Sequence, residues 1–222
     1  MESKSETNIE RYLNSLSDNI SIIDVNCKGN GIVYLPDLTR FKNLKKLRCS
    51  YNQLTSLPAL PPNLEELECC HNQLTSLPAL PQNLKRLYCS YNQLTSLPDL
   101  PPNLQILYCY NNQLTSLPDL PPNLQILNCS NNKLTSLPDL PPNLEELYCI
   151  CNKLTSLPDL PPNLKELYCF ENQLTSLPVF SFLDYLENKY LTRTSKKSST
   201  ISGEYHREPY YNTSVPTCYA TN

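Results

Sequence analysis

Leucines recur along the chain at a fixed interval. From Leu44 onward the sequence follows a 20-residue pattern, LxxLxCxxNxLTSLPxLPPN. Seven copies of it begin at Leu44, Leu64, Leu84, Leu104, Leu124, Leu144 and Leu164. An eighth, weaker copy precedes a stretch two residues longer and keeps the same offsets at Ile22, Val25, Cys27, Asn30, Ile32, Leu35 and Leu38. A repeat of this length predicts a solenoid in which each unit stacks on the next.

The two halves of the repeat predict different backbone conformations. In the first half, Leu107 and Cys109 have the period-two spacing of a short strand whose alternate residues point into the core. The second half contains two or three prolines, which lack a donor and fix φ near about −65°, so we expect an extended, polyproline-like return. Ordering one repeat costs about 1.5 kcal/mol per residue, more than its leucines recover. The copies must therefore stack, with their strands in a parallel sheet.

A helical cap is predicted in front of the repeats, within residues 1–21. The helix is expected to span residues 6–18, because Thr7 and Glu10 have the spacing of a capping box. One helical face collects the apolar residues Ile9, Tyr12, Leu13, Leu16 and Ile20. This face would cover the first layer of leucines.

The remaining boundaries follow from where the pattern starts and stops. The eight repeats are expected to occupy residues 22–178. Residues 179–191 contain several aromatic and leucine residues that predict a C-terminal cap. Residues 192–222 are rich in Ser, Thr, Lys and Tyr without periodicity, which predicts a flexible tail.

The repeat resembles known families. LxxLxCxxNxL is the signature of leucine-rich repeats, and LPxLPxxLxxL resembles the short repeats of secreted bacterial effectors, including effectors joined to a ubiquitin-ligase domain. The cysteine-containing version is also similar to repeat proteins encoded by giant DNA viruses. The resemblance implies a leucine-rich-repeat solenoid with its parallel sheet on the concave face and a binding role. Only 44 residues follow Pro178, too few for the ligase domain, so a subunit or truncated relative of such a ligase is the alternative.

Composition narrows the classes of partner and compartment. The net charge is −3, which gives no overall attraction to nucleic acid or an acidic membrane. No apolar stretch approaches the roughly 20 residues that a membrane span requires. The 11 cysteines are odd in number and mostly recur at one spacing, which favours reduced thiols and a cytoplasmic location.

The recurring cysteines are interpreted as small buried hydrophobes. Thiols on neighbouring parallel strands point the same way, which suits neither a disulfide nor a tetrahedral zinc site. The residues concerned are Cys27, Cys49, Cys69, Cys89, Cys109, Cys129, Cys149 and Cys169. No metal or cofactor is expected.

Other recurring polar residues are also interpreted as structural. The asparagine that follows each strand is expected to satisfy backbone groups where the chain turns. Asp99, Asp119, Asp139 and Asp159 recur on the return segment, where one carboxylate per layer predicts a solvated row rather than a calcium site. Cys70, His71 and Cys151 are expected to face solvent, but no base and oxyanion group converge on them. We therefore expect no catalytic residue and no small-molecule substrate.

Charges on the strands alternate between copies. Lys45, Lys46 and Arg48 lie beside Glu65, Glu66 and Glu68, which lie beside Lys85 and Arg86. Ion pairs between neighbouring strands explain this alternation, each worth about 0 to 1 kcal/mol when exposed.

The copies differ from one another mainly at the outward strand positions and just after them. There the chain changes from charged to aromatic and apolar along the array, with Tyr51 and Tyr91 at the border. The predicted partner-binding residues are Tyr88, Ile106, Tyr108, Tyr110, Ile126, Tyr148, Ile150, Tyr168 and Phe170. Aromatic residues on a rigid exposed sheet are typical of protein-binding hot spots. Stacking that merely stabilises the sheet is the alternative, whereas binding of single-stranded nucleic acid is disfavoured because Lys and Arg are not interleaved.

The sequence thus predicts a non-enzymatic scaffold that binds a partner protein through its concave face. A viral or bacterial adaptor or effector acting on a host protein is the expected setting. A self-associating structural protein is a further alternative.

Overall fold

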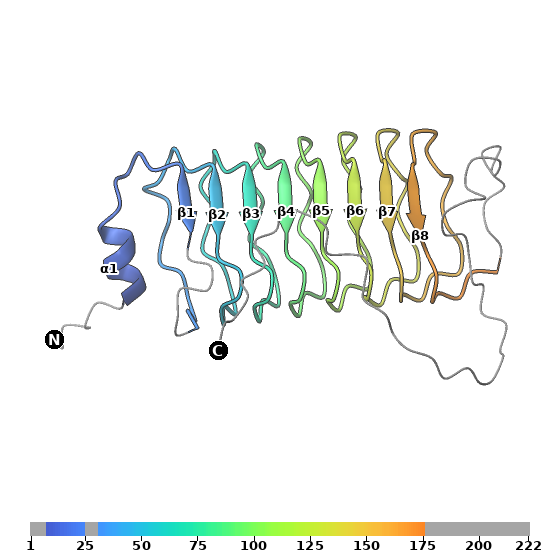
Figure 1. Cartoon of the computed structure of the whole chain (residues 1–222), viewed down its shortest axis with the longest axis horizontal. Coiled ribbons are helices and arrows are strands. Elements are labelled where there is room, and N and C mark those ends of the chain that lie inside the picture. The colour runs from blue at the N-terminus through green and yellow to red at the C-terminus, as the bar shows by residue number, and fades with distance from the viewer. Residues whose placement is uncertain (1–7, 25–30, 176–222) are drawn as a thin grey trace.

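One parallel sheet organises the molecule (Figure 1). The computed structural model describes residues 8–24 and 31–175. Within these ranges, eight strands of three residues each follow one another across the sheet in chain order. They are β1 (Ile22–Asp24), β2 (Lys46–Arg48), β3 (Glu66–Glu68), β4 (Arg86–Tyr88), β5 (Ile106–Tyr108), β6 (Ile126–Asn128), β7 (Glu146–Tyr148) and β8 (Glu166–Tyr168). The predicted leucine-rich-repeat solenoid is confirmed.

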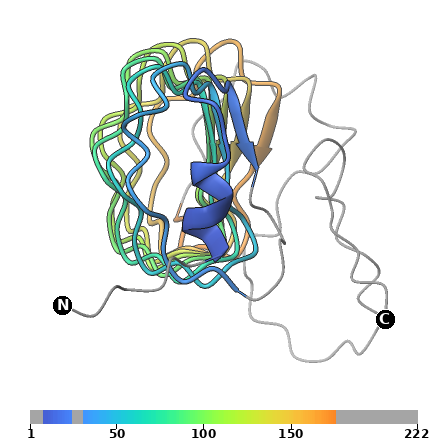
Figure 2. The same ribbon diagram turned by 90° about the vertical axis from the view of Figure 1, so that its left-hand side faces the viewer.

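Each turn of the solenoid closes around a layer of leucines. Figure 2 looks along the array and shows the strands on one wall and the return segments on the opposite wall. The central residue of each strand is buried, and those of β1–β7, such as Leu87, pair in register with their equivalents one repeat later, here Leu107. The return segments between β2 and β8 contain no helix, as their prolines predict.

The asparagine after each strand connects three backbone segments. Asn112 donates from Nδ2 to the carbonyls of Cys89, Cys109 and Tyr110 at 3.0–3.4 Å. Its Oδ1 accepts from the backbone N–H of Leu94 at 3.0 Å. Equivalent bonds recur at Asn72, Asn92, Asn132, Asn152 and Asn172. The structural role predicted for this asparagine ladder is confirmed, although Asn30 lies outside the described residues.

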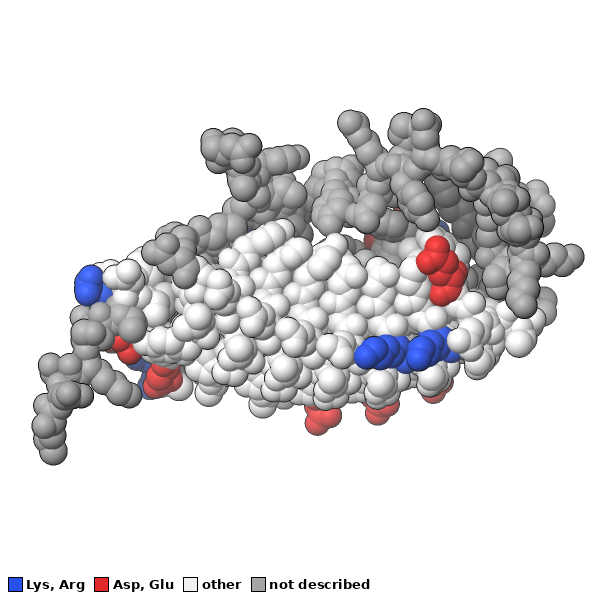
Figure 3. Space-filling model, turned by 90° about the horizontal axis from the view of Figure 1, so that it is seen from below, with Lys and Arg blue, Asp and Glu red and all other residues white. Residues whose placement is uncertain are grey.

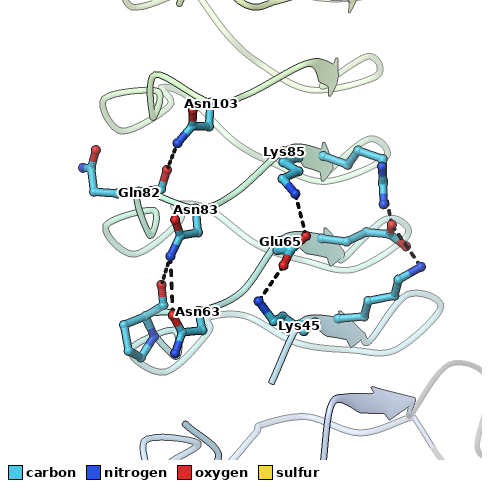
Figure 4. A network of polar contacts seen from close by, with 11 residues as sticks. Lys45, Asn63, Glu65, Gln82, Asn83, Lys85 and Asn103 are labelled. Carbon is cyan, nitrogen blue, oxygen red and sulfur yellow. Dashed lines mark hydrogen bonds and ion pairs between the residues drawn. The ribbon is translucent and has the colours of Figure 1, made fainter. Parts of the chain in front are cut away.

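A second asparagine ladder follows the prolines and was not anticipated. Asn103 donates to the carbonyl of Gln82 at 3.1 Å, and Asn83 contacts Asn63 at 3.4 Å (Figure 4). Asn123 makes the equivalent bond to the carbonyl of Pro102 at 3.0 Å. These side chains are exposed, so each bond fixes the spacing between turns at the surface. The signal in the sequence was the invariant Asn of LPPN.

The N-terminal helix ends earlier than predicted. Within the described residues, helix α1 spans Asn8–Asn14 and stops four residues before the predicted end at residue 18, and it buries Leu13 against the first layer. It ends where Ser15 donates its hydroxyl to the carbonyl of Tyr12 at 2.6 Å. Residues such as Ser and Asn compete for backbone groups in this way and are poor helix formers. Thr7 of the expected capping box lies outside the described residues.

The first repeat has a different register from the one predicted. Ile23, not Val25, pairs with Leu47 and is fully buried, whereas Ile22 is 44% exposed. The strand therefore begins two residues earlier relative to its neighbour. A shift of two leaves the same alternate residues facing the core, so alternation alone could not distinguish the two registers.

The C-terminal predictions fall on residues outside the described ranges. These are the last residues of the repeat array at 176–178, the cap at 179–191 and the tail at 192–222. They stay predictions.

The asparagine ladder predicts a large difference between two similar substitutions. Asn112→Ala leaves several buried backbone groups without a partner and should lower the free energy of unfolding by about 2 to 3 kcal/mol. Asn123→Ala removes one exposed bond and should cost about 1 kcal/mol or less. Urea denaturation followed by circular dichroism measures both values, and equal losses would contradict the assigned role.

Candidate functional site

The first and third residues of strands β2–β8 point out of the sheet, and we call this surface the sheet face. Because the strands pair in register, equivalent residues form two rows across the sheet. One row continues through Lys46, Glu66, Arg86, Ile106, Ile126, Glu146 and Glu166. The other continues through Arg48, Glu68, Tyr88, Tyr108, Asn128, Tyr148 and Tyr168.

The sheet face begins with a network of opposite charges. Glu66 lies between Lys46 at 3.4 Å and Arg86 at 2.6 Å, and Arg48 contacts Glu68 at 2.9 Å. The predicted ion pairs are therefore confirmed. Both carboxylates are less exposed than predicted, at 5% for Glu66 and 7% for Glu68.

Burial and charge act in opposite directions on these two carboxyls. Burial raises the pKa of Glu66, but hydrogen bonding and ion pairing with Arg86 outweigh it and hold the pKa below its usual value. Burial and the neighbouring Glu66 carboxyl together raise the pKa of Glu68. Lys46, Arg48 and Arg86 each contact a carboxylate of this network.

Beside the sheet face, Glu65 bridges two lysines. Its carboxylate contacts Lys45 at 2.6 Å and Lys85 at 2.8 Å (Figure 4). Hydrogen bonds from Lys45 and Lys85 lower the pKa of Glu65 to about 2. These residues also lie at the N-terminal end of the array.

Aromatic rings occupy the middle of the sheet face. Tyr88 and Tyr108 meet edge to face with ring centroids 5.4 Å apart, and Tyr108 meets Tyr110 at 6.4 Å. Ile106 pairs in register with Ile126 beside them. We call these five residues the central cluster. All five are half-buried, so the structure brings together the middle group of predicted residues.

A second group of predicted residues lies at the C-terminal end. Tyr148 and Tyr168 stack with centroids 4.9 Å apart and planes 11° from parallel. The Tyr148 hydroxyl lies 3.0 Å from Glu146 Oε2 and 2.7 Å from Glu166 Oε2. Burial and the hydrogen bond to Glu166 raise the pKa of Tyr148. Asn128 lies between Tyr108 and Tyr148 in one row of the sheet face, whereas Ile126 of the central cluster pairs directly with Glu146 in the other row.

Two more predicted contact residues lie beyond the strands, at the position that Tyr110 has in its own turn. Phe170 is 39% exposed. Ile150, by contrast, is only 7% exposed, and its N–H donates to the hydroxyl of Ser130 at 3.2 Å. Ser90 and Ser130 are also buried at the equivalent position of other turns, whereas Tyr110 and Phe170 are not. Ile150 therefore packs between turns and offers little surface to a partner.

A stack of three rings at the rim, where the strands end, was only partly anticipated. His71 lies between Tyr51 and Tyr91, at centroid distances of 4.3 and 4.0 Å. Each of the three has a positive φ between 52° and 58°. Because this backbone conformation is the same in the three successive turns, the three side chains point in the same direction and can stack. Figure 3 shows this side of the molecule, where the visible middle coils present mainly uncharged side chains. The signal in the sequence was an aromatic residue at the same position of three successive copies.

Comparisons with known proteins agree with this geometry. The family profile described as Leucine Rich repeats (2 copies) matches residues 62–101, 82–122 and 122–162. A solved Shigella effector LRR domain is 30% identical, with a TM-score of 0.60, over 76% of this chain and 75% of that chain. This chain is a leucine-rich-repeat protein. No curated protein matches it.

Two further solved leucine-rich-repeat structures are similar. YopM, an effector from Yersinia pestis, is 43% identical with a TM-score of 0.71, over 74% of this chain and 46% of YopM. The functional domain of InlJ from Listeria monocytogenes, which includes a cysteine ladder, is 31% identical with a TM-score of 0.52, over 70% of this chain and 40% of that chain. The chain thus spans less than half of the YopM structure. The resemblance to bacterial effector repeats is confirmed, and the resemblance to giant-virus proteins stays a prediction.

The recurring thiols of this leucine-rich-repeat protein lie in the core. The seven from Cys49 to Cys169 are buried and free, as predicted, whereas Cys27 lies outside the described residues. Burial raises the pKa of each of them. Such thiols stay protonated and react slowly.

Cys70 and Cys151 differ from the solvent-facing thiols that we expected. Cys70 is half-buried, and burial raises its pKa to about 12. Cys151 donates to Glu171 Oε2 at 2.6 Å, and burial together with this carboxylate raises its pKa to about 12. Neither is an activated nucleophile.

In the part of the chain that the structure describes, no three His, Cys, Asp or Glu side chains are grouped to hold a metal ion. None of the helices in that part is long and apolar enough to cross a membrane.

The Cys151–Glu171 contact predicts a change in thiol reactivity. Glu171→Gln removes a carboxylate that opposes the thiolate, so the pKa of Cys151 should fall. A fall of about one unit raises the rate of alkylation near pH 8 about tenfold. Iodoacetamide labelling with peptide mapping measures the rate, and Asp159→Asn is the control of equal charge change. An unchanged rate in Glu171→Gln would show that the contact does not control this thiol.

Proposed function

We propose that this chain is a non-enzymatic scaffold that binds a partner protein through the sheet face, which corresponds to the predicted concave side. The central cluster carries the proposal. Tyr88 and Tyr108 present half-buried rings on the sheet beside Ile106 and Ile126, and the half-buried ring of Tyr110, just after β5, contacts Tyr108. Fixed aromatic and aliphatic side chains of this kind lose little conformational entropy on binding.

The charges around the cluster support a protein rather than a nucleic acid. The basic side chains of β2 and β4 contact Glu66 and Glu68, so they neutralise their own neighbours. Strands β5–β8 carry no Lys or Arg. Nucleic-acid surfaces need unpaired cations interleaved with stacking rings.

The family and its neighbours support the same conclusion at a coarser level. Leucine-rich-repeat proteins and the Shigella and Yersinia effector structures favour an interaction scaffold. We further propose that the chain is an adaptor or effector that acts in the cytoplasm on a host protein. Its seven buried thiols suit a reducing compartment, because they serve as packing groups.

The central cluster predicts how affinity depends on two tyrosines. Replacing Tyr108 and Tyr110 with Ala removes two ring surfaces and should weaken partner binding by about 2 kcal/mol, the usual hot-spot scale. The partner is first identified by affinity capture from host cells and mass spectrometry. It is then purified and titrated against each variant by calorimetry.

Two controls separate binding from folding. The Phe double variant at the same positions keeps the rings and should retain most of the affinity, while Asp119→Asn with Asp139→Asn changes two exposed return-segment residues. Full affinity in the Ala variant would refute the central cluster as the contact. A shift in the elution volume of every form with concentration would instead indicate self-association.

A further inference from the structure

Two carboxylates lie side by side at the C-terminal end of the sheet face. Glu146 of β7 and Glu166 of β8 pair in register, and strands lie about 4.8 Å apart. Like charges directly opposite each other destabilise a sheet. In strands β2–β4 the same row alternates in sign through Lys46, Glu66 and Arg86. The C-terminal pair departs from that pattern.

The contacts of this pair do not neutralise it. The Tyr148 hydroxyl lies within hydrogen-bond distance of both carboxylates, but one hydroxyl has one proton and donates it to one of them at a time. Lys165 is engaged by Glu145 at 2.6 Å. Among the described residues, no Lys or Arg forms an ion pair with Glu146 or Glu166.

The stacked rings beside the carboxylates favour a cationic ligand, as the two carboxylates themselves do. Tyr148 and Tyr168 stand next to the two acids on the same strands, with nearly parallel planes. Aromatic faces attract cations, and a guanidinium also stacks on them. Carboxylates accept from a guanidinium in a planar, two-bond geometry that an ammonium cannot match. Acids and rings therefore favour arginine over lysine.

We propose that Glu146, Tyr148, Glu166 and Tyr168 form an acidic-aromatic surface that binds an arginine-containing segment of the partner protein. The guanidinium lies between the two carboxylates and relieves their repulsion. This inference rests on the proposed function and specifies the chemistry of the partner. Charge complementarity assigns the surface to a basic segment, while the central cluster contacts an adjoining apolar part of the same partner.

The test compares peptides that differ in one residue type. Fluorescent peptides on a common Gly-Ser background carry Arg, Lys or Glu, and anisotropy measures their binding to the full chain. Binding should be tightest for Arg, weaker for Lys and absent for Glu. Glu146→Gln with Glu166→Gln should weaken the Arg peptide about tenfold or more, whereas Asp119→Asn with Asp139→Asn, an equal change in charge, should have no effect.

Three results would overturn the assignment. Equal binding of the Arg and Glu peptides, or equal losses in the two double variants, would show that no specific arginine site exists. The full-length variant R193S/K196S/K197S tests whether the chain's own basic segment occupies the surface. If only this variant binds the Arg peptide, the chain's own basic segment occupies the surface instead of a partner.

The partner assay distinguishes this inference from the proposed function. A captured partner that is lost by Tyr108→Ala with Tyr110→Ala but retained by Glu146→Gln with Glu166→Gln would refute the arginine site and leave the scaffold proposal intact. A partner that tolerates both double variants would refute both proposals.

Discussion

The stacking of turns in this solenoid depends on one asparagine side chain per repeat, whose amide forms hydrogen bonds with two successive turns. Each amide donates to carbonyls of its own turn and of the preceding one, and its oxygen accepts from the preceding turn's backbone. A buried backbone group without a partner is costly, so the amide must reach the same atoms in every copy. This constraint keeps the repeat at 20 residues and holds the strands in register.

Because the buried leucines and the asparagine amides fix the backbone, the outward strand residues can vary without changing the fold. They differ from one end of the array to the other. Opposite charges pair on β2–β4, rings and isoleucines occupy β4–β6, and an acid pair with stacked rings occupies β7 and β8. Similar backbones thus present three different surfaces in sequence.

The repetitive part of the fold could be predicted from sequence because it rests on spacing. The strands, the buried cysteines, the asparagine ladder and the helix-free return all follow from residues that recur at one interval. Features without repetition were harder to predict. Ile23 pairs with Leu47, and alternation did not reveal this because a two-residue shift leaves the same alternate residues facing the core. Helix α1 ends at Asn14, where the hydroxyl of Ser15 donates to the carbonyl of Tyr12.

The candidate site was predicted in part for a related reason. Alternation correctly placed the outward residues of the strands, such as Tyr108 and Tyr148. Alternation does not extend beyond the third residue of a strand, so Ile150 could not be recognised as buried and the stacking of His71 between two tyrosines was only partly anticipated. The pairing of Glu146 with Glu166 was present in the sequence but became a site only when the register placed them side by side.

The turn that carries Asn128 has a consequence of its own. Its outward pair is Ile126 and Asn128, and Asn128 lies between Tyr108 and Tyr148 while Ile126 of the central cluster pairs with Glu146. Duplicating this turn would move Tyr108 away from Tyr148 by about 4.8 Å and would keep every residue of both surfaces. Unequal recombination between near-identical repeats can therefore change the spacing of the two surfaces by whole turns. Proteins descended from this gene could then match differently spaced epitopes on a partner without new side chains.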